Sequence, residues 1–409
     1  MPLFKGFFYP TRTTCFAFKL GMNTMFDNTA VAFQSKSKKS LLKAYWLFRF
    51  MGWNKLTKIG TYFVKIALKT PLGLKKIIKN TLYRQFCGGE TLVECQETIA
   101  ELSKFGLLTI PDYVAEGQDD EESFNAACDQ ILATIAMAKE NKAIAFAVFK
   151  VTAIGSFEVL EKKQRGDVFS AQETMAWFAL KARFNKLIQA ASESNIRILI
   201  DAEETWIQDV VDELTLDAMM RYNDTKALVF ITCQMYRKDM LHRLKSLADR
   251  AREQHFNLGV KLVRGAYLER ENARAMALGL VSPMHPCKED TDQAFDSALH
   301  FCLEQGIHVC IGTHNEESVL KAIAFMKTLH INASTEHVCF AQLYGMSDHI
   351  SFNLAAQGYC VAKYLPFGPM ELSLPYLFRR ANENKSIAGQ VSRELLLIKN
   401  ELQRRAKQS

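Results

Sequence analysis

From residue 106 onward, short apolar runs rich in β-branched residues alternate with longer segments of helical periodicity. This alternation constrains the fold more than any other feature. Eight such runs predict strands, at residues 107–113, 144–152, 196–201, 227–234, 258–267, 308–314, 337–343 and 359–366. Helical spacing fills the intervals, for example at residues 175–191, 237–255, 291–305 and 316–329. Eight strand–helix repeats favour a (βα)8 barrel of the TIM type, and a doubly wound open sheet is the alternative. A Rossmann nucleotide site is disfavoured because no GxGxxG motif occurs.

The charge distribution divides the chain into two parts. Residues 1–89 hold sixteen Lys and Arg and one acid, Asp27, although the whole chain carries only +7. We therefore predict a basic, amphipathic helical region over residues 1–89 and a catalytic barrel over residues 90–409. The lysines of the first region could form a solvated face of helices packed on the barrel, or a surface that docks on anionic lipid. No apolar stretch approaches the roughly 20 residues of a membrane-spanning helix. The ten cysteines include no CxxC pair, which favours a reducing compartment.

Polar residues that end the predicted strands are the candidates for a functional site, because chemistry in such barrels lies at the carboxyl ends of the strands. These residues are Asp112, Lys150, Thr152, Asp201, Glu203, Glu204, Gln234, Lys261, Arg264, Tyr267, Thr313, His314, Asn315, Gln342 and Tyr364.

Two basic motifs suit an anionic or flat ligand. Lys261 and Arg264 end the fifth run beside Gly265, and cations there could stabilise a reduced flavin ring or form a structural ion pair. Arg379 and Arg380 are adjacent on a predicted helix after the eighth run. Two guanidiniums could bind a carboxylate, or lie on a salt-bridged surface. Both interpretations of each motif are open at this point.

An acidic motif follows the third run. Asp201, Glu203 and Glu204 could hold Mg²⁺ in a metal-dependent barrel lyase or hydrolase, or could orient cations such as Lys150 by ion pairing. His314 has no second histidine at metal-ligand spacing, so we do not expect a zinc site there.

With these motifs in order, residues 85 to 385 resemble the proline dehydrogenase (proline oxidase) family, in its monofunctional, FAD-dependent form. The resemblance rests on FCGGET at residues 86–91, DAEE at 201–204, KLVRGAY at 261–267, THN at 313–315, QLYGM at 342–346 and YLFRRANEN at 376–384.

The resemblance implies where cofactor and substrate lie. FAD would be held at the barrel mouth by Gln234, Lys261, Val263, Arg264, Gly265, Ala266, Thr313 and His314, with Glu383 toward its ribose. The proline carboxylate would pair with Lys150, Arg379 and Arg380, and the proline ring would be enclosed by Leu262, Tyr267, Tyr364 and Tyr376. Hydride would pass from C5 of proline to N5 of the flavin. Asp201, Lys261 and Tyr267 are the expected catalytic residues, with Asp201 positioning the basic groups.

One departure bears on the cofactor contact. Many bacterial members of the family read RLVKGAY where this chain reads KLVRGAY, which looks like the mitochondrial pattern, and by position Lys261 is the cation expected at flavin N5. Hydroxyproline-oxidising relatives have a smaller residue where this chain has Tyr364. The resemblance therefore favours L-proline over hydroxyproline.

The resemblance also implies partners. The product, Δ1-pyrroline-5-carboxylate, would go to a pyrroline-5-carboxylate dehydrogenase, and electrons would go to a membrane quinone. We expect a bacterial protein on the cytoplasmic face of the inner membrane, docked on anionic lipid, with the mitochondrial inner membrane or matrix as the alternative. Nucleic acid is not expected as a partner, because the basic segment lacks an aromatic stacking platform.

Overall fold

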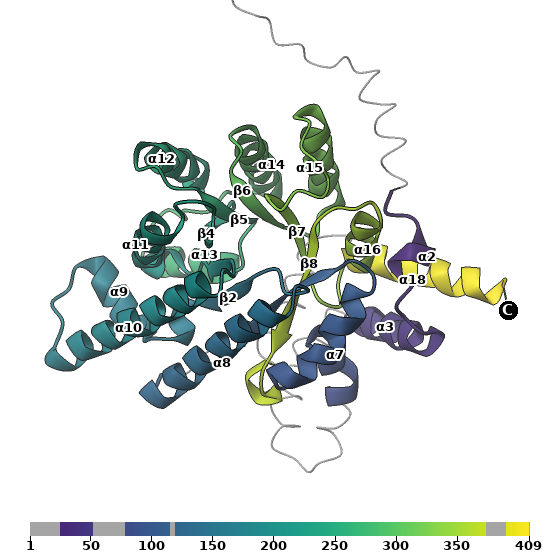
Figure 1. The fold of residues 1–409 in the computed structure, drawn as a ribbon, viewed down its shortest axis with the longest axis horizontal. Coiled ribbons are helices and arrows are strands. Elements are labelled where there is room, and N and C mark those ends of the chain that lie inside the picture. Colours follow the sequence, from purple (N-terminus) through teal and green to yellow (C-terminus); the bar gives the residue numbers. More distant parts are fainter. Residues whose placement is uncertain (1–24, 52–77, 115–118, 374–389, 409) are drawn as a thin grey trace, which may run out of the picture.

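The computed structural model describes residues 25–51, 78–114, 119–373 and 390–408. Eight parallel strands form one sheet in the order β1-β8-β7-β6-β5-β4-β3-β2, with helices around it (Figure 1). Each strand lies within the run predicted for it, except that β8 extends one residue further. The strands are β1 (Leu108–Tyr113), β2 (Ala147–Lys150), β3 (Ile198–Asp201), β4 (Val229–Gln234), β5 (Gly259–Val263), β6 (His308–Gly312), β7 (Val338–Leu343) and β8 (Val361–Phe367).

The sheet closes between its first two strands. β1 pairs with β8 along its whole length, and on its other side Thr109 forms a parallel bridge with Ile144, just before β2. The backbone N–H of Thr109 donates to the Ala143 carbonyl at 2.8 Å, and the N–H of Ala145 donates to the Thr109 carbonyl at the same distance. The (βα)8 barrel predicted from the alternation is therefore confirmed, and the open sheet was the wrong alternative.

The helices of the barrel begin where the sequence provides caps. At the start of α10, Ser170 and Glu173 form a capping box, and Asp120 caps α8 by accepting from Ser123 N–H at 2.8 Å. The helices after β1 to β7 are α8 (Glu121–Glu140), α9 (Phe157–Arg165), α10 (Ala171–Glu193), α11 (Thr205–Tyr222), α12 (Met240–Glu253), α13 (Leu268–Ala277), α14 (Lys288–Glu304), α15 (Glu316–Thr328) and α16 (Asp348–Ala356). A short 3-10 turn, η2 (Val151–Ala153), follows β2.

Apolar side chains fill two layers because successive residues of a strand point to opposite faces. The barrel interior holds Phe146 and Phe230 in an edge-to-face contact, with ring centroids 5.2 Å apart. Cys310 and Cys339 lie in the same interior cluster, whereas Cys233 packs between the barrel and its helices. All three are buried and form no disulfide.

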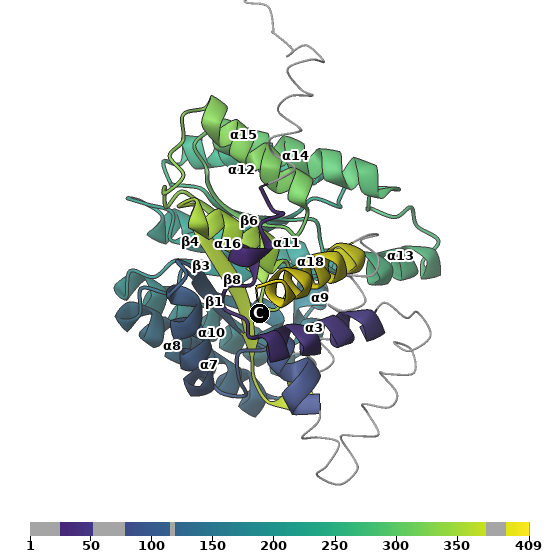
Figure 2. The ribbon, with the colours of Figure 1, turned by 90° about the vertical axis from the view of Figure 1, so that its right-hand side faces the viewer.

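Helices from both ends of the chain pack together on one side of the barrel (Figures 1 and 2). Leu41 and Phe48 of α3 share a core cluster with Leu397 and Ile398 of the last helix. The elements before the barrel are α2 (Thr29–Ala32), α3 (Lys38–Met51), η1 (Lys79–Tyr83), α6 (Arg84–Phe86) and α7 (Leu92–Ser103), and the last helix is α18 (Gln390–Ala406). Arg405 of α18 donates to two backbone carbonyls in the segment that follows α2. α3 thus has a packed apolar face.

Candidate active site

A buried carboxylate, that of Asp201 at the end of β3, is the centre of the polar cluster at the strand ends. Its Oδ1 accepts from Lys261 Nζ on β5 at 2.6 Å, and its Oδ2 accepts from the Tyr364 hydroxyl on β8 at 2.7 Å. Lys150 Nζ on β2 lies 3.8 Å from Oδ2. Four strands that are distant in sequence therefore contribute to one group of contacts. The structure brings together the four strand-end residues that the sequence singled out.

Electrostatics keep this carboxylate ionised. Burial of Asp201 favours its neutral form, but the ammonium groups of Lys261 and Lys150 outweigh burial and lower the pKa of the carboxyl below its usual value. The Lys261 ammonium also lies over the Tyr364 ring, 4.6 Å from the ring centroid. Asp112, at the end of β1, is almost fully buried and lies 3.7 Å from Lys150 Nζ. Two acids and two lysines, with side chains between 1% and 12% exposed, thus balance each other in this cluster.

The side chains of the acidic motif after β3 contact different partners. Glu203 accepts from the hydroxyl and the N–H of Thr152 at 2.5 and 3.2 Å. Glu204 pairs with Arg270 on α13. Burial raises the pKa of Glu203 to about 7, although the Thr152 hydrogen bonds lower it. Among the described residues, no three His, Cys, Asp or Glu side chains converge as metal ligands would. The metal-dependent alternative built on this motif therefore has no support in the geometry.

The segment after β5 bends sharply at Gly265. Its φ of +131° lies in a region that other residues rarely adopt, and a Cβ atom there would lie 2.4 Å from the Tyr236 ring. The preceding Arg264 is held by three partners, Asp292 at 2.7 Å, Thr313 at 2.7 Å and Ser318 at 3.0 Å. Arg264 therefore ties the β5 and β6 ends to α14 and α15.

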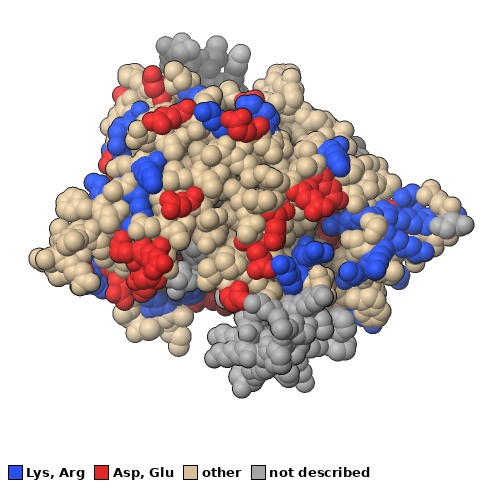
Figure 3. All heavy atoms as spheres, turned by 60° about the horizontal axis from the view of Figure 1, so that its bottom comes forward, with Lys and Arg blue, Asp and Glu red and all other residues tan. Residues whose placement is uncertain are grey.

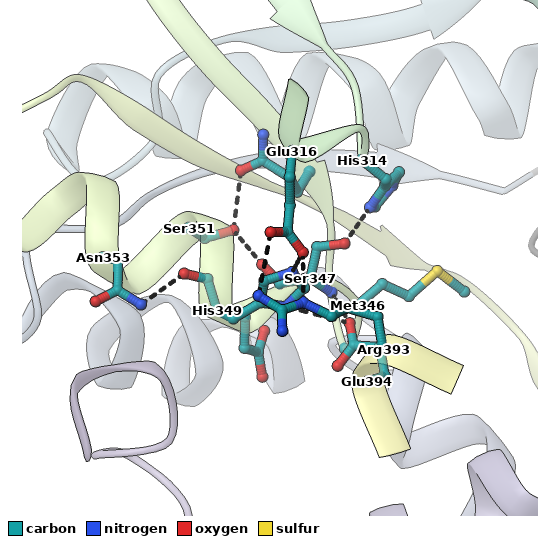
Figure 4. A network of polar contacts seen from close by, with 12 residues as sticks. His314, Glu316, Met346, Ser347, His349, Ser351, Asn353, Arg393 and Glu394 are labelled. Carbon is teal, nitrogen blue, oxygen red and sulfur yellow. Dashed lines mark hydrogen bonds and ion pairs between the residues drawn. The ribbon is translucent and has the colours of Figure 1, made fainter. Parts of the chain in front are cut away.

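The end of β6 is held by a polar network that reaches the last helix (Figure 4). The His314 ring nitrogen Nδ1 lies 2.9 Å from the Ser347 hydroxyl, and Ser347 is a non-glycine residue in the left-handed region with a φ of +51°. The Ser347 N–H donates to the buried carboxylate of Glu394 on α18. Beside it, Arg393 Nε donates to Glu316 at 2.9 Å. α18 therefore fixes the loop that orients His314.

The remaining predicted residues fall into four groups. Gln234 is buried at the end of β4, where its side-chain amide donates to the Glu203 carbonyl at 2.7 Å. Tyr267 is buried, and Val263 and Ala266 are half-buried beside the β5 end. Leu262 is not brought to this cluster: it is fully buried with the residues that pack between barrel and helices, because it alternates with Lys261 along the strand. The predicted residues Tyr376, Arg379, Arg380 and Glu383 lie outside the described residues.

Some contributors to the site were not assigned a role by sequence reasoning. Asp112 ends the first predicted strand, and that position is the signal from which its contact with Lys150 could be inferred. Ser347 and Glu394 carry no such signal, because they are 47 residues apart and meet only through the packing of α18.

Comparison with known proteins assigns the family. The sequence profile described as proline dehydrogenase matches residues 95–393, well over half of the chain. The chain belongs to the proline dehydrogenase family. Membership of this family makes the chain an oxidoreductase that acts on proline, and it confirms the resemblance carried by the motifs.

Two relatives and one solved structure illustrate the range of this proline dehydrogenase family. The chain is 34% identical over 350 residues to the carbapenem antibiotics biosynthesis protein CarD of Pectobacterium carotovorum, covering 85% of this chain and 90% of CarD. It is 31% identical over 428 residues to the mitochondrial proline dehydrogenase 1 of Dictyostelium discoideum, covering 92% and 74%. The structure of proline utilization A from Bdellovibrio bacteriovorus, inactivated by N-propargylglycine, matches with a TM-score of 0.76 at 20% identity. That match covers 90% of this chain and 41% of the other, and it supports the barrel fold.

Proposed function

We propose that this chain oxidises L-proline to Δ1-pyrroline-5-carboxylate with FAD as cofactor, and that the electrons go to a membrane quinone. The observation that carries the proposal is the buried Asp201 carboxylate, held at 2.6 and 2.7 Å by Lys261 and Tyr364 and paired with Lys150. Such a centre fixes cations and an aromatic ring in place before any ligand arrives. Preorganised charge and orientation are the main contributions of a protein to hydride transfer.

The substrate is an amino acid with a carboxylate and an apolar ring, and the described residues offer partners for both. Lys150 supplies a mostly buried ammonium for the carboxylate. Arg379 and Arg380 are proposed to complete this pairing from the sequence motif that they share with the family. The buried rings of Tyr364 and Tyr267 suit the apolar part of proline. Asp201 positions Lys261 and Tyr364, and its low pKa keeps it charged throughout.

The residues at the ends of β4, β5 and β6 fit a flavin. These three strands are direct neighbours in the sheet. They carry an amide (Gln234) at the end of β4, an ammonium (Lys261) within β5 and a histidine (His314) just past the end of β6. The set matches a flat ring with hydrogen-bonding edges that gains negative charge on reduction. The proline dehydrogenases are flavoproteins. Bound FAD would supply the acceptor for the hydride leaving C5 of proline.

We further propose where the chain works and which proteins take its products. A quinone acceptor places the enzyme at a membrane, on the cytoplasmic face of a bacterial inner membrane or, as the alternative, on the mitochondrial inner membrane. The mitochondrial relative supports the second location. Among the described residues, no helix has the length and apolarity to cross a membrane. A pyrroline-5-carboxylate dehydrogenase is the proposed consumer of the product.

The test is the visible spectrum of the purified protein under anaerobic conditions. The proposal predicts a yellow protein whose flavin absorbance bleaches on addition of L-proline, more readily than with hydroxyproline. Asp201→Asn should keep the flavin colour but bleach far more slowly, whereas Asp167→Asn, a surface control, should behave as wild type. A protein that neither carries nor accepts FAD, or that loses its activity to a chelator, would contradict the proposal. Preferred bleaching by hydroxyproline would replace L-proline as the substrate.

A further inference from the structure

Helix α3 has two faces of different character. Leu41, Ala44 and Phe48 are buried against the rest of the molecule. On its other side, Leu42 and Trp46 are 42% and 51% exposed, one helical turn apart. The helix is therefore anchored by its first face, and its second face carries apolar side chains that are about half exposed.

The exposed charged residues of α3 itself all have the same sign. On α3 the exposed charged residues are Lys38, Lys39, Lys43 and Arg49, and the Arg49 guanidinium lies 5.5 Å from the Trp46 ring centroid. The neighbouring α18 adds the exposed Lys399, and the exposed Lys407 directly follows this helix, whereas the acids of α18 are buried. Lys and Arg side chains gather over the end of the molecule where these two helices lie side by side (Figure 3).

We propose that the exposed face of α3, together with Lys399 and Lys407, is the surface by which this chain docks on an anionic lipid bilayer. This surface is called the α3 face below. It combines the two features that such docking requires: Trp and Leu side chains that enter the headgroup region, and basic groups that meet lipid phosphate. The absence of any acid between residues 28 and 89 removes the repulsion that a mixed surface would suffer. The inference rests on the proposed quinone acceptor for its biological meaning, but its test does not depend on that acceptor.

The orientation of the face is fixed by the fold. Arg405 of α18 donates to the Lys36 and Phe33 carbonyls at 2.6 and 2.9 Å, which holds the chain between α2 and α3. The docking helix is therefore an integral part of the folded body, and binding would place the whole barrel in one orientation on the membrane. A truncation would disturb this packing, so point variants of the full chain are the right test.

The experiment is cosedimentation of the full protein with vesicles of phosphatidylglycerol and phosphatidylcholine, with pure phosphatidylcholine vesicles as reference. Each basic group near an anionic surface adds about fivefold to binding. Lys39→Gln with Lys43→Gln should therefore weaken partitioning about 25-fold. Lys139→Gln with Lys142→Gln, a matched exposed pair at the end of α8, should leave it unchanged. A blue shift of tryptophan emission on the anionic vesicles should disappear in Trp46→Phe, which keeps the other three tryptophans.

The outcomes separate this inference from the proposed function. Proline-dependent reduction of a soluble dye should be equal in the wild type and the α3-face variant, whereas reduction of quinone embedded in the vesicles should fall with binding. Equal binding by the α3-face and control variants, or an unchanged emission shift in Trp46→Phe, would overturn the docking surface and leave the oxidation of proline untouched. Dye reduction that fails in the wild type would instead overturn the proposed function, and the vesicle measurements would still decide the surface.

Discussion

Replacement of Asp201 by Asn tests whether one buried carboxylate organises the strand ends. The substitution keeps the size of the side chain and removes its charge. In the wild type, this carboxylate accepts from Lys261 and Tyr364 and pairs with Lys150. An amide retains one oxygen, so it can accept from one of the two donors, and it leaves the ammonium of Lys261 without a countercharge at 2.6 Å.

The expected cost follows from the burial of both partners. The side chains of Asp201 and Lys261 are only 12% and 9% exposed, so solvent cannot replace the lost charge. Removal of one partner from a buried ion pair costs about 3–5 kcal/mol, and the retained amide oxygen favours the lower end, about 3 kcal/mol. The effect depends on pH. Because the pKa of Asp201 is lowered in the folded protein, its contribution is present above the unfolded pKa of about 3.9 and is lost as pH falls through the folded value.

Urea unfolding followed by circular dichroism measures this cost. With a denaturant slope of about 3 kcal/mol/M, a loss of about 3 kcal/mol moves the midpoint by about 1 M at pH 7. The control is Asp167→Asn, which breaks an ion pair with Arg165 whose side chains are 44% and 52% exposed. It should cost less than about 1 kcal/mol. The reasoning is refuted if Asp201→Asn unfolds at the midpoint of this control, or if its deficit does not shrink below pH 4.

Three further changes probe the same region. Tyr364→Phe removes the 2.7 Å hydrogen bond to Asp201, which is worth about 2 kcal/mol. Steady-state assays should show that kcat/KM for proline falls about 30-fold. An unchanged kcat/KM would remove Tyr364 from the site. Gly265→Ala should lower the free energy of unfolding by about 3 kcal/mol in thermal unfolding, because the new Cβ would clash with the Tyr236 ring and the backbone φ of +131° is unfavourable for alanine. A neutral effect would mean that this loop adapts freely. The folded pKa of Glu203, raised to about 7, predicts stability that is present below pH 4.5 and is lost, by about 3 kcal/mol, as pH rises to 7. Glu203→Gln should lack this slope in urea titrations at several pH values, and an equal slope in both proteins would place the titration elsewhere.

The position of every strand could be predicted from the sequence, because apolar β-branched runs bounded by turns have few other structures available. The ends of the strands were less predictable. The run at 144–152 forms a strand only over Ala147–Lys150, because Val151–Ala153 turns into a 3-10 helix. The run at 258–267 stops at Val263 because Gly265 takes a positive φ. Local backbone geometry, which hydrophobic patterns do not encode, decides such ends.

The polar cluster could be predicted in its members but not in its pairings. Strand ends meet at one face of a barrel, so Asp201, Lys150, Lys261 and Tyr364 could be grouped without coordinates. The sequence did not show that Lys261 would bond directly to Asp201, because that pairing depends on the radius and register of the closed sheet. The contacts of Arg264 with Asp292 and Ser318 could not be predicted either, because they depend on how α14 and α15 pack beside the β5 end.

The two ends of the chain are connected to the site by contacts between buried groups. α3 packs on α18 through Leu397 and Ile398, and α18 places Glu394 against the N–H of Ser347. The Ser347 hydroxyl in turn holds His314 at the end of β6. The α3 face and the β6 end are therefore parts of one packed unit. Deletion of the segment before residue 78 would expose Leu397 and Ile398 and remove the carbonyl partners of Arg405. A shortened chain that lost both membrane binding and flavin would consequently report on folding, whereas surface substitutions on α3 change the docking face alone.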